Sequence, residues 1–281
     1  MTRAIGALAE IAGNYDAIVL DQWGVLHDGS AAYPGVIAAL DSLASSGHRL
    51  AVLSNSGKRA RPNLDRIARM GFPEGIFAAV VTSGEALWQD VRNNRVPHRS
   101  FLPIECRKGD AARWAEGLRV ELTSDPASAQ AVLLMGIPDG STMEEWRTVL
   151  QRALDVRLVV YCSNPDMVSP RGDGPLVMQP GALAEDFRGQ GGEVINYGKP
   201  GRRVFEAMRE MLGVEPDRIL MVGDSLEHDI AGAHAAGWDS LLVFGGIFRD
   251  AAPDGDHQAA LNETAMASKL PLPDYTIGIL Q

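Results

Sequence analysis

The fold of this chain is decided by the stretch Ile18-Val19-Leu20-Asp21-Gln22-Trp23-Gly24-Val25-Leu26. Its apolar run of β-branched and leucine residues stops at Asp21, which predicts a buried strand that delivers a carboxylate to the end of a parallel sheet. Proteins of the α/β class bind their ligands at that end. An aspartate there can also cap a turn or a helix, so its role depends on the rest of the chain.

Strands and helices alternate in the first and last parts of the chain, which are separated by an insertion at residues 87–190. Further buried strands are predicted at 50–53, 77–83, 193–197, 218–222, 240–244 and 275–280. Helical periodicity is predicted at 36–44, 58–70, 204–212 and 230–236. This spacing is the βαβ pattern of a parallel sheet. We therefore predict an α/β fold with a doubly wound parallel sheet, built from residues 1–86 and 191–281.

Residues 87–190 predict a second, smaller α/β unit inserted into the first. This unit contains a strand at 131–136, a helix at 143–154 and a strand at 158–162. Ser141 and Thr142 precede the helix as capping residues. Residues 91–109 show no clean periodicity, and 163–174 are dense in turn residues. Near the C-terminus, 250–274 is interpreted as a surface segment.

Composition narrows the classes of function. The chain has 281 residues, 46% of them apolar, and a formal net charge of −10, so it can bury a full α/β core, while its acidity disfavours nucleic acid or an anionic membrane as the main partner. Cys106 and Cys162 are too few for a disulfide framework. We see no signal-type or membrane-spanning apolar run, so a cytoplasmic protein is expected.

Polar side chains follow four of the predicted strands. They are Asp21, the pair Ser54 and Asn55, Lys199, and the pair Asp224 and Asp229. Carboxylate oxygens suit Mg²⁺, which takes one or two carboxylates together with water and substrate phosphate oxygens. A hydroxyl, an amide and an ammonium group suit the remaining phosphate oxygens. Each signal is weak alone, but their order and their common place at strand ends make the combination strong.

In this order, Asp21, Ser54, Lys199 and the Asp224 and Asp229 pair resemble the four motifs of the haloacid dehalogenase-like superfamily. The insertion resembles the C2-type cap of its class IIA, the NagD-like branch. The resemblance implies that Asp21 is the nucleophile of an aspartyl-phosphate intermediate.

The resemblance also distributes the other roles. Ser54, Asn55, Gly24 and Lys199 would bind the phosphoryl group, and Lys199 would also neutralise charge on Asp21.

By the same resemblance, Mg²⁺ is the expected cofactor. Asp21, Asp224 and the backbone carbonyl of Trp23 would ligate it, and Asp229 would support the metal site. On the cap, the segment with Asn164, Pro165 and Asp166 would face the substrate, which the resemblance implies is a small phosphorylated metabolite: a sugar phosphate, a nucleotide or a cofactor phosphate. Such caps can pair, so a homodimer stays open.

Trp23 departs from the phosphatase pattern, which has a second aspartate there as general acid and base. An indole cannot exchange a proton near neutral pH, and losing such help costs roughly 10²- to 10⁴-fold in rate. Three interpretations stay open. The protein is a slow phosphatase, with or without His27 or Asp28 standing in; it is a binding or regulatory protein that kept the pocket; or, ranked last because that chemistry needs no Mg²⁺, it is a dehalogenase.

Overall fold

Strand β2 (Ala17–Leu20) lies inside a seven-stranded parallel sheet, and all four of its residues are buried. The computed structural model describes residues 2–169, 176–249 and 256–280. The strand order of this sheet is β1 (Arg3–Ala4), β14 (Tyr275–Ile277), β13 (Asp239–Val243), β12 (Ile219–Gly223), β2, β3 (Arg49–Ser54) and β4 (Phe77–Thr82). Since the strands are parallel, β2, β3 and β12 end at the same edge.

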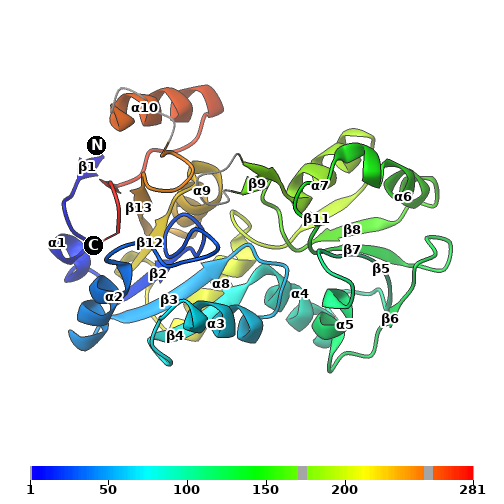
Figure 1. Ribbon diagram of the computed structural model, residues 1–281, viewed down its shortest axis with the longest axis horizontal. Coiled ribbons are helices and arrows are strands. Elements are labelled where there is room, and N and C mark those ends of the chain that lie inside the picture. The colour runs from blue at the N-terminus through cyan, green and yellow to red at the C-terminus, as the bar shows by residue number, and fades with distance from the viewer. Residues whose placement is uncertain (1, 170–175, 250–255, 281) are drawn as a thin grey trace.

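Helices cover both faces of this sheet (Figure 1). Buried side chains of α2 and α3 pack on one face, and those of α8 and α9 pack on the other. The helices of this unit, which we call the core, are α1 (Ala9–Ala12), α2 (Val36–Ser45), α3 (Ala60–Arg69), α8 (Arg202–Leu212), α9 (Ala231–Ala236) and α10 (His257–Ser268), with a 3-10 turn at Pro216–Arg218 and a π turn at Leu226–Ile230. The predicted doubly wound sheet is confirmed.

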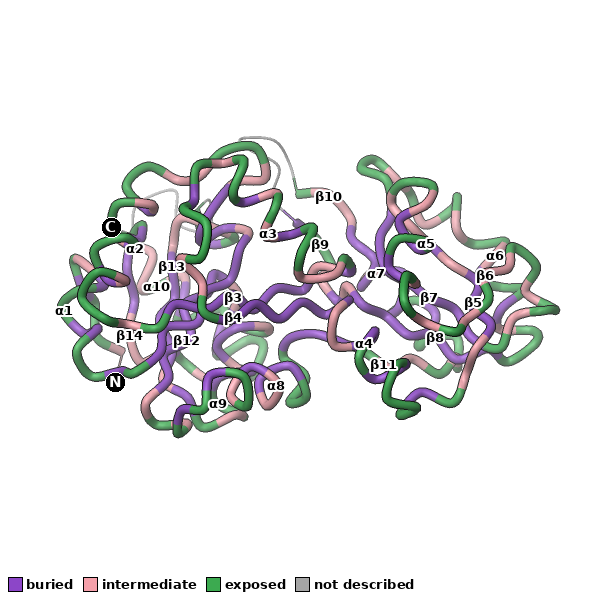
Figure 2. The backbone as a smooth tube through the Cα atoms, turned by 90° about the horizontal axis from the view of Figure 1, so that it is seen from below, coloured by how far each residue is buried: buried purple, intermediate pink, exposed green. Residues whose placement is uncertain are grey.

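The inserted unit, which we call the cap, is a second parallel sheet. Its strand order is β11 (Val194–Asn196), β8 (Val159–Cys162), β7 (Ala131–Leu134), β5 (Ser100–Ile104) and β6 (Glu121–Leu122). Its helices are α4 (Ser83–Arg92), α5 (Asp110–Ala115), α6 (Met143–Asp155) and α7 (Pro180–Gly189). Helices α4 and α5 pack on one face and α6 and α7 on the other. A short antiparallel pair, β9 (Val168–Ser169) and β10 (Val177–Met178), lies between the units. Figure 2 shows the resulting two lobes, each with buried strands at its centre.

The two segments that join core and cap are tied together. Helix α4 leaves the core, and Tyr197 lies on the return segment. The Tyr197 hydroxyl donates to Oδ2 of Asp90 on α4 at 2.8 Å, and Arg203 of α8 donates to the same oxygen at 2.6 Å. These contacts fix the cap relative to the edge of the core sheet where Asp21 lies.

The structure corrects the assignment of residues 193–197. They were predicted to belong to the first sheet, but β11 pairs with β8 of the cap. The cap therefore extends to Asn196, and the predicted division at residue 191 is too early. Nothing in an isolated three-residue strand tells which of two sheets it will join.

Several elements escape the sequence pattern. Strand β5 was not predicted because Pro103 interrupts its apolar run. Proline has no amide hydrogen for a sheet, and the neighbouring strand β6 pairs only with Ser100 and Phe101, before the proline. Helices α7 and α10 were predicted as no element at all: α7 opens on Pro180-Gly181, which looks like a turn, and α10 buries only two of its residues. The predicted loop residues 170–174 and residues 250–255 of the predicted surface segment lie outside the described residues. Among those described, no helix is long and apolar enough to cross a bilayer.

The loop after β2 contains a buried histidine. His27 is fully buried, and its Nδ1 accepts a hydrogen bond from the Gly29 amide at 3.1 Å. Its Nε2 has no hydrogen-bond partner in the described part of the chain. Burial, with the nearby charge of Arg66, lowers the pKa of His27 to about 4. The folded protein therefore holds this imidazole neutral.

This burial predicts a loss of stability in mild acid. As the pH falls from about 6.5 to about 4, His27 becomes protonated in the unfolded chain but stays neutral in the folded protein, so the free energy of unfolding decreases. Between pH 7 and pH 4.5 we expect wild type to lose about 2 kcal/mol more than His27→Asn, which keeps an acceptor near the position of Nδ1. Urea titrations at the two pH values measure this difference. Equal losses in the two proteins would show that His27 does not titrate as described.

Candidate active site

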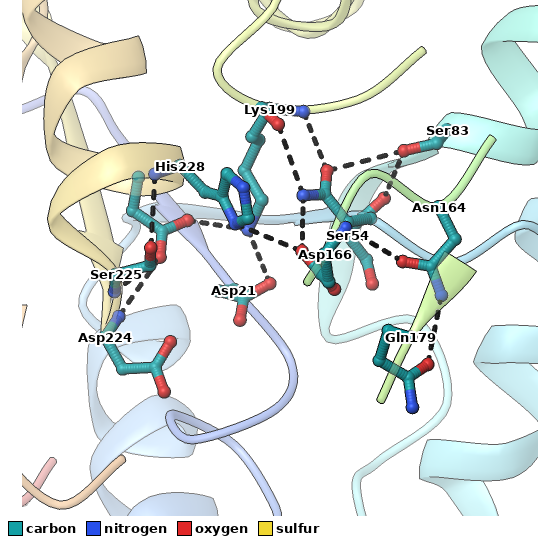
Figure 3. Close-up of polar contacts among 12 residues, drawn as sticks. Asp21, Ser54, Ser83, Asn164, Asp166, Gln179, Lys199, Asp224, Ser225 and His228 are labelled. Atoms are coloured by element: carbon teal, nitrogen blue, oxygen red, sulfur yellow. Dashed lines mark hydrogen bonds and ion pairs between the residues drawn. The ribbon is translucent and has the colours of Figure 1, made fainter. Parts of the chain in front are cut away.

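Four chain segments bring their polar residues to one edge of the core sheet (Figure 3). Asp21 follows β2, Ser54 ends β3, and Asp224 follows β12. Lys199 comes from the segment that returns from the cap. All four residues are at most 8% exposed. The predicted convergence of residues far apart in the chain is therefore present in the structure.

Lys199 connects two of the carboxylates. Its Nζ donates to Oδ1 of Asp21 and to Oδ1 of Asp229, each at 2.6 Å. The other oxygen of Asp229 accepts hydrogen bonds from the backbone amides of Asp224 and Ser225, each at 3.1 Å. Asp229 thus holds both the ammonium group and the turn that carries Asp224.

The carboxylate cluster fits a divalent cation. Oxygens of Asp21, Asp224 and Asp229 lie within 4.8 Å of one another, and all three residues are buried. Three carboxylates against the single ammonium of Lys199 leave an excess of negative charge, and oxygen donors are those that Mg²⁺ prefers. Asp21 and Asp224 are the better ligands, because both oxygens of Asp229 are already hydrogen-bonded. The predicted ligand role of the Trp23 carbonyl stays a prediction.

The excess negative charge appears in the pKa values. Burial raises the pKa of Asp21 to about 7, although Lys199 acts in the opposite direction. Burial, together with the charges of Asp21 and Asp229, raises the pKa of Asp224 well above its usual range. Burial disfavours the charge on Lys199, but the two carboxylates outweigh it, and its pKa is raised. The site therefore favours binding of additional positive charge.

Two glycines are required by close approaches. Gly24 has φ of 79°, and a Cβ there would lie 1.9 Å from Oδ2 of Asp224. Gly198 has φ of 121°, and a Cβ there would lie 2.3 Å from Oγ of Ser83. The amide of Gly24 donates to the carbonyl of His27 at 3.2 Å. The structure thus places Gly24 beside Asp224, and its predicted phosphate contact stays a prediction.

The side chain of Asn55 is hydrogen-bonded to two other residues, and its predicted phosphate contact stays a prediction. Its Oδ1 accepts from the Lys199 amide at 2.7 Å, and its Nδ2 donates to Oδ1 of Asp166 at 2.8 Å. The side chain therefore positions Lys199 and contacts the cap, which leaves its backbone as the group that can meet a phosphate. Ser54 lines the cavity, so its predicted phosphate contact stays a prediction.

The two predicted cap residues both reach the site. The Nδ1 atom of His228 lies 3.1 Å from the same Asp166 oxygen that Asn55 contacts. Burial alone would raise the pKa of Asp166, but His228 and Asn55 lower it. Asn164 accepts from the Asp166 amide at 3.3 Å and donates to Gln179 at 3.3 Å. Asp166 therefore links cap and core, and both predicted residues line the cavity.

A cavity of about 540 Å³ opens from the carboxylates toward the cap. The indole of Trp23 forms part of its wall, with the Arg66 guanidinium 4.5 Å from the ring centroid. The two groups considered as substitutes for an acid do not line it. His27 is buried elsewhere, and one oxygen of Asp28 accepts bonds from Ser30 and Ala31.

Other residues that line the cavity, His228 and Gln179, were not predicted from the sequence. His228 is the imidazole on its wall among the described residues, and Gln179 supports Asn164. The position of His228 inside the Asp224 to Asp229 motif was a usable signal. Gln179 precedes an unpredicted helix and offered none.

Two sequence-family models match the first and last parts of the chain. The model described as haloacid dehalogenase-like hydrolase matches residues 18–108. The model described as HAD-hydrolase-like matches residues 196–269. The first match contains Asp21 and Ser54, and the second contains Lys199, Asp224 and Asp229.

Similar proteins extend the match to the cap. A crystal structure of a haloacid dehalogenase-like hydrolase from Brucella suis 1330 has a TM-score of 0.83 and 30% identity, covering 99% of this chain and 100% of that one. Chronophin from Homo sapiens is 29% identical over 262 residues, which is 86% of this chain and 86% of that protein. Glycerol-3-phosphate phosphatase from Gallus gallus is 28% identical over 264 residues, which is 84% of this chain and 82% of that protein. The chain therefore belongs to the haloacid dehalogenase-like hydrolase family, with the inserted cap of its class IIA.

Proposed function

We propose that the protein hydrolyses small phosphomonoesters with Mg²⁺, through an aspartyl-phosphate on Asp21. The observation that carries the proposal is the contact of Lys199 with Asp21 beside the Asp224 carboxylate, at the inner end of the cavity. The name of the glycerol-3-phosphate phosphatase relative supports the same class of reaction. A nucleophilic carboxylate next to an ammonium group suits transfer of a phosphoryl group.

Asp21 would act as the nucleophile. Lys199 holds one of its oxygens, so the other is available to attack phosphorus. As the bond from Asp21 to phosphorus forms, the bond from phosphorus to the leaving oxygen breaks, and water then releases phosphate and restores Asp21. Mg²⁺ held by Asp21 and Asp224 would supply positive charge that offsets the charge on the phosphoryl oxygens. Lys199 would add to that stabilisation throughout.

Trp23 determines which esters react well. The leaving oxygen must depart without a proton from residue 23, because an indole is a donor that does not release its proton near neutral pH. Neither His27 nor Asp28 lines the cavity. Esters with good leaving groups, such as aryl phosphates, should therefore react faster than alkyl phosphates.

The same residue favours one alternative. With an aromatic wall in place of an acid, the site could bind a phosphorylated ligand without useful turnover. A protein of this kind would keep the Asp21, Lys199 and Asp224 cluster and lack phosphate release.

The proposal predicts that Asp21→Asn abolishes phosphate release. Release should be measured with 4-nitrophenyl phosphate and glycerol 3-phosphate, with and without Mg²⁺, and wild type should need Mg²⁺ and favour the aryl ester. Asp28→Asn is the matched control, since it changes a nearby carboxylate outside the cavity and should leave release within about twofold. Asp21→Asn activity close to wild type would remove Asp21 from its role. Tight binding of these esters by wild type without any release would favour the alternative.

Replacing Trp23 tests the missing acid. Trp23→Asp should raise turnover of glycerol 3-phosphate, by up to about 10²-fold, because the new carboxyl group can protonate the leaving oxygen. Trp23→Asn is the matched control, with the same size and no proton to give, and it should show no gain. Steady-state rates for both variants, with circular dichroism to confirm folding, decide the point. A folded Trp23→Asp protein no faster than Trp23→Asn would contradict the assignment.

A further inference from the structure

A small crevice between core and cap gathers positive charge. Its volume is about 170 Å³, and it lies between residues at the start of α3 on the core and residues of α5 on the cap, two helices on the same side of the molecule (Figure 1). Its charged lining residues are Lys58, Arg59, Arg107, Arg113 and Asp110. Four positive charges and one negative charge thus meet in a chain whose formal net charge is −10. The crevice suits an anion.

Two of the four cations are held in place by partners. Arg59 donates to both carboxylate oxygens of Glu85, at 2.6 and 3.1 Å, and its guanidinium lies 3.6 Å from the centroid of the Trp88 ring. Arg113 pairs with Asp110 on its own helix. These pairs form a fixed wall whose charge is largely balanced.

The other two cations that line the crevice come one from each unit and have no such carboxylate partner among the described residues. Lys58 belongs to the core and Arg107 to the cap, and both are exposed. No carboxylate of the described residues lies within 4.0 Å of either charged group. Both charges act on the thiol of Cys106: burial and the charges of Asp110 and Asp139 raise the pKa of this thiol, and Lys58 and Arg107 act in the opposite direction. An anion between them would meet two charge-assisted donors.

The crevice adjoins the catalytic cavity. Lys58 and Pro62 line both of them. A single small molecule can therefore place one group beside Asp21 and extend another along this wall.

We propose that the crevice binds a second anionic group of the substrate, so that the substrate class is a phosphomonoester that also carries a carboxylate or a second phosphate. This inference rests on the proposed function for the place of the reacting phosphate. Lys58 of the core and Arg107 of the cap bind the second anion, which joins core to cap when the substrate is present. They are specificity-determining residues and do not touch the reacting phosphorus.

Matched pairs of esters test the proposal. 3-Phosphoglycerate is compared with glycerol 3-phosphate, and 6-phosphogluconate with sorbitol 6-phosphate, because the members of each pair differ in the carboxylate and share the type of leaving group. Arg107→Gln should lower kcat/KM by at least about tenfold for the carboxylates and by less than about twofold for the two esters without a carboxylate. Lys58→Gln, whose side chain also lines the catalytic cavity, should lower kcat/KM more for the carboxylates than for those two esters. Arg119→Gln removes an exposed cap arginine outside the crevice and is the control. It should leave kcat/KM unchanged for both members of each pair.

The outcomes separate this inference from the proposed function. Wild type with no preference in either pair, or variants that lose equally on both members, would overturn it. Titration calorimetry with the same four compounds and Mg²⁺ covers the case of no turnover. If the carboxylates bind more tightly and Arg107→Gln removes that difference, the inference stands while the hydrolase proposal fails. Activation of 4-nitrophenyl phosphate hydrolysis by added sulfate, dependent on Arg107 and without preference for the carboxylates, would show a separate regulatory anion and contradict it.

Discussion

The site depends on the hydrogen bonds of the Lys199 ammonium group to two carboxylates. This lysine is almost fully buried and bonds both Asp21 and Asp229 at 2.6 Å. Removing one partner of such a buried pair typically costs about 3 to 5 kcal/mol, because the remaining charge stays buried without compensation. Apolar residues could fill the same space without the cost of burying charged groups. A buried cluster of this kind is therefore better explained by chemistry than by stability, and the sheet edge that carries it is where α/β proteins bind ligands.

The neighbourhood of Trp23 sets the character of the leaving-group side. The indole of Trp23, with the Arg66 guanidinium 4.5 Å from its ring centroid, forms part of the cavity wall, and under the proposed function it takes the place of a proton donor. Arg66 also donates to the carbonyl of Gly29 at 2.8 Å, which holds it against the loop after β2. Under the proposed function, the site thus has residues for binding and attack but no acid at position 23. Leaving-group quality and contacts with distant parts of the substrate become more important in such a site.

Sequence reasoning worked best where one short segment carries its own signal. The apolar run before Asp21 and the strand before Asp224 are buried on both faces, so their composition alone predicted them. The sequence did not predict which sheet a short strand joins, because that depends on its neighbour in the folded protein: β11 pairs with β8 of the cap. The sequence also did not indicate that the Asn55 side chain contacts Lys199 and Asp166, since the cap brings that carboxylate to the core. Periodicity contains no information on contacts between units.

The proposed mechanism requires that Asp21 forms the covalent bond to phosphorus. Its most direct test is a single-turnover reaction of wild type with 4-nitrophenyl phosphate and Mg²⁺, stopped in acid within the first turnover and reduced with borohydride, which converts an aspartyl-phosphate to homoserine. Mass spectrometry of the peptide that contains residue 21 should then show homoserine at that position and at no other aspartate. Modification of a different residue, or release of phosphate with an unmodified Asp21 throughout the turnover, would contradict the account.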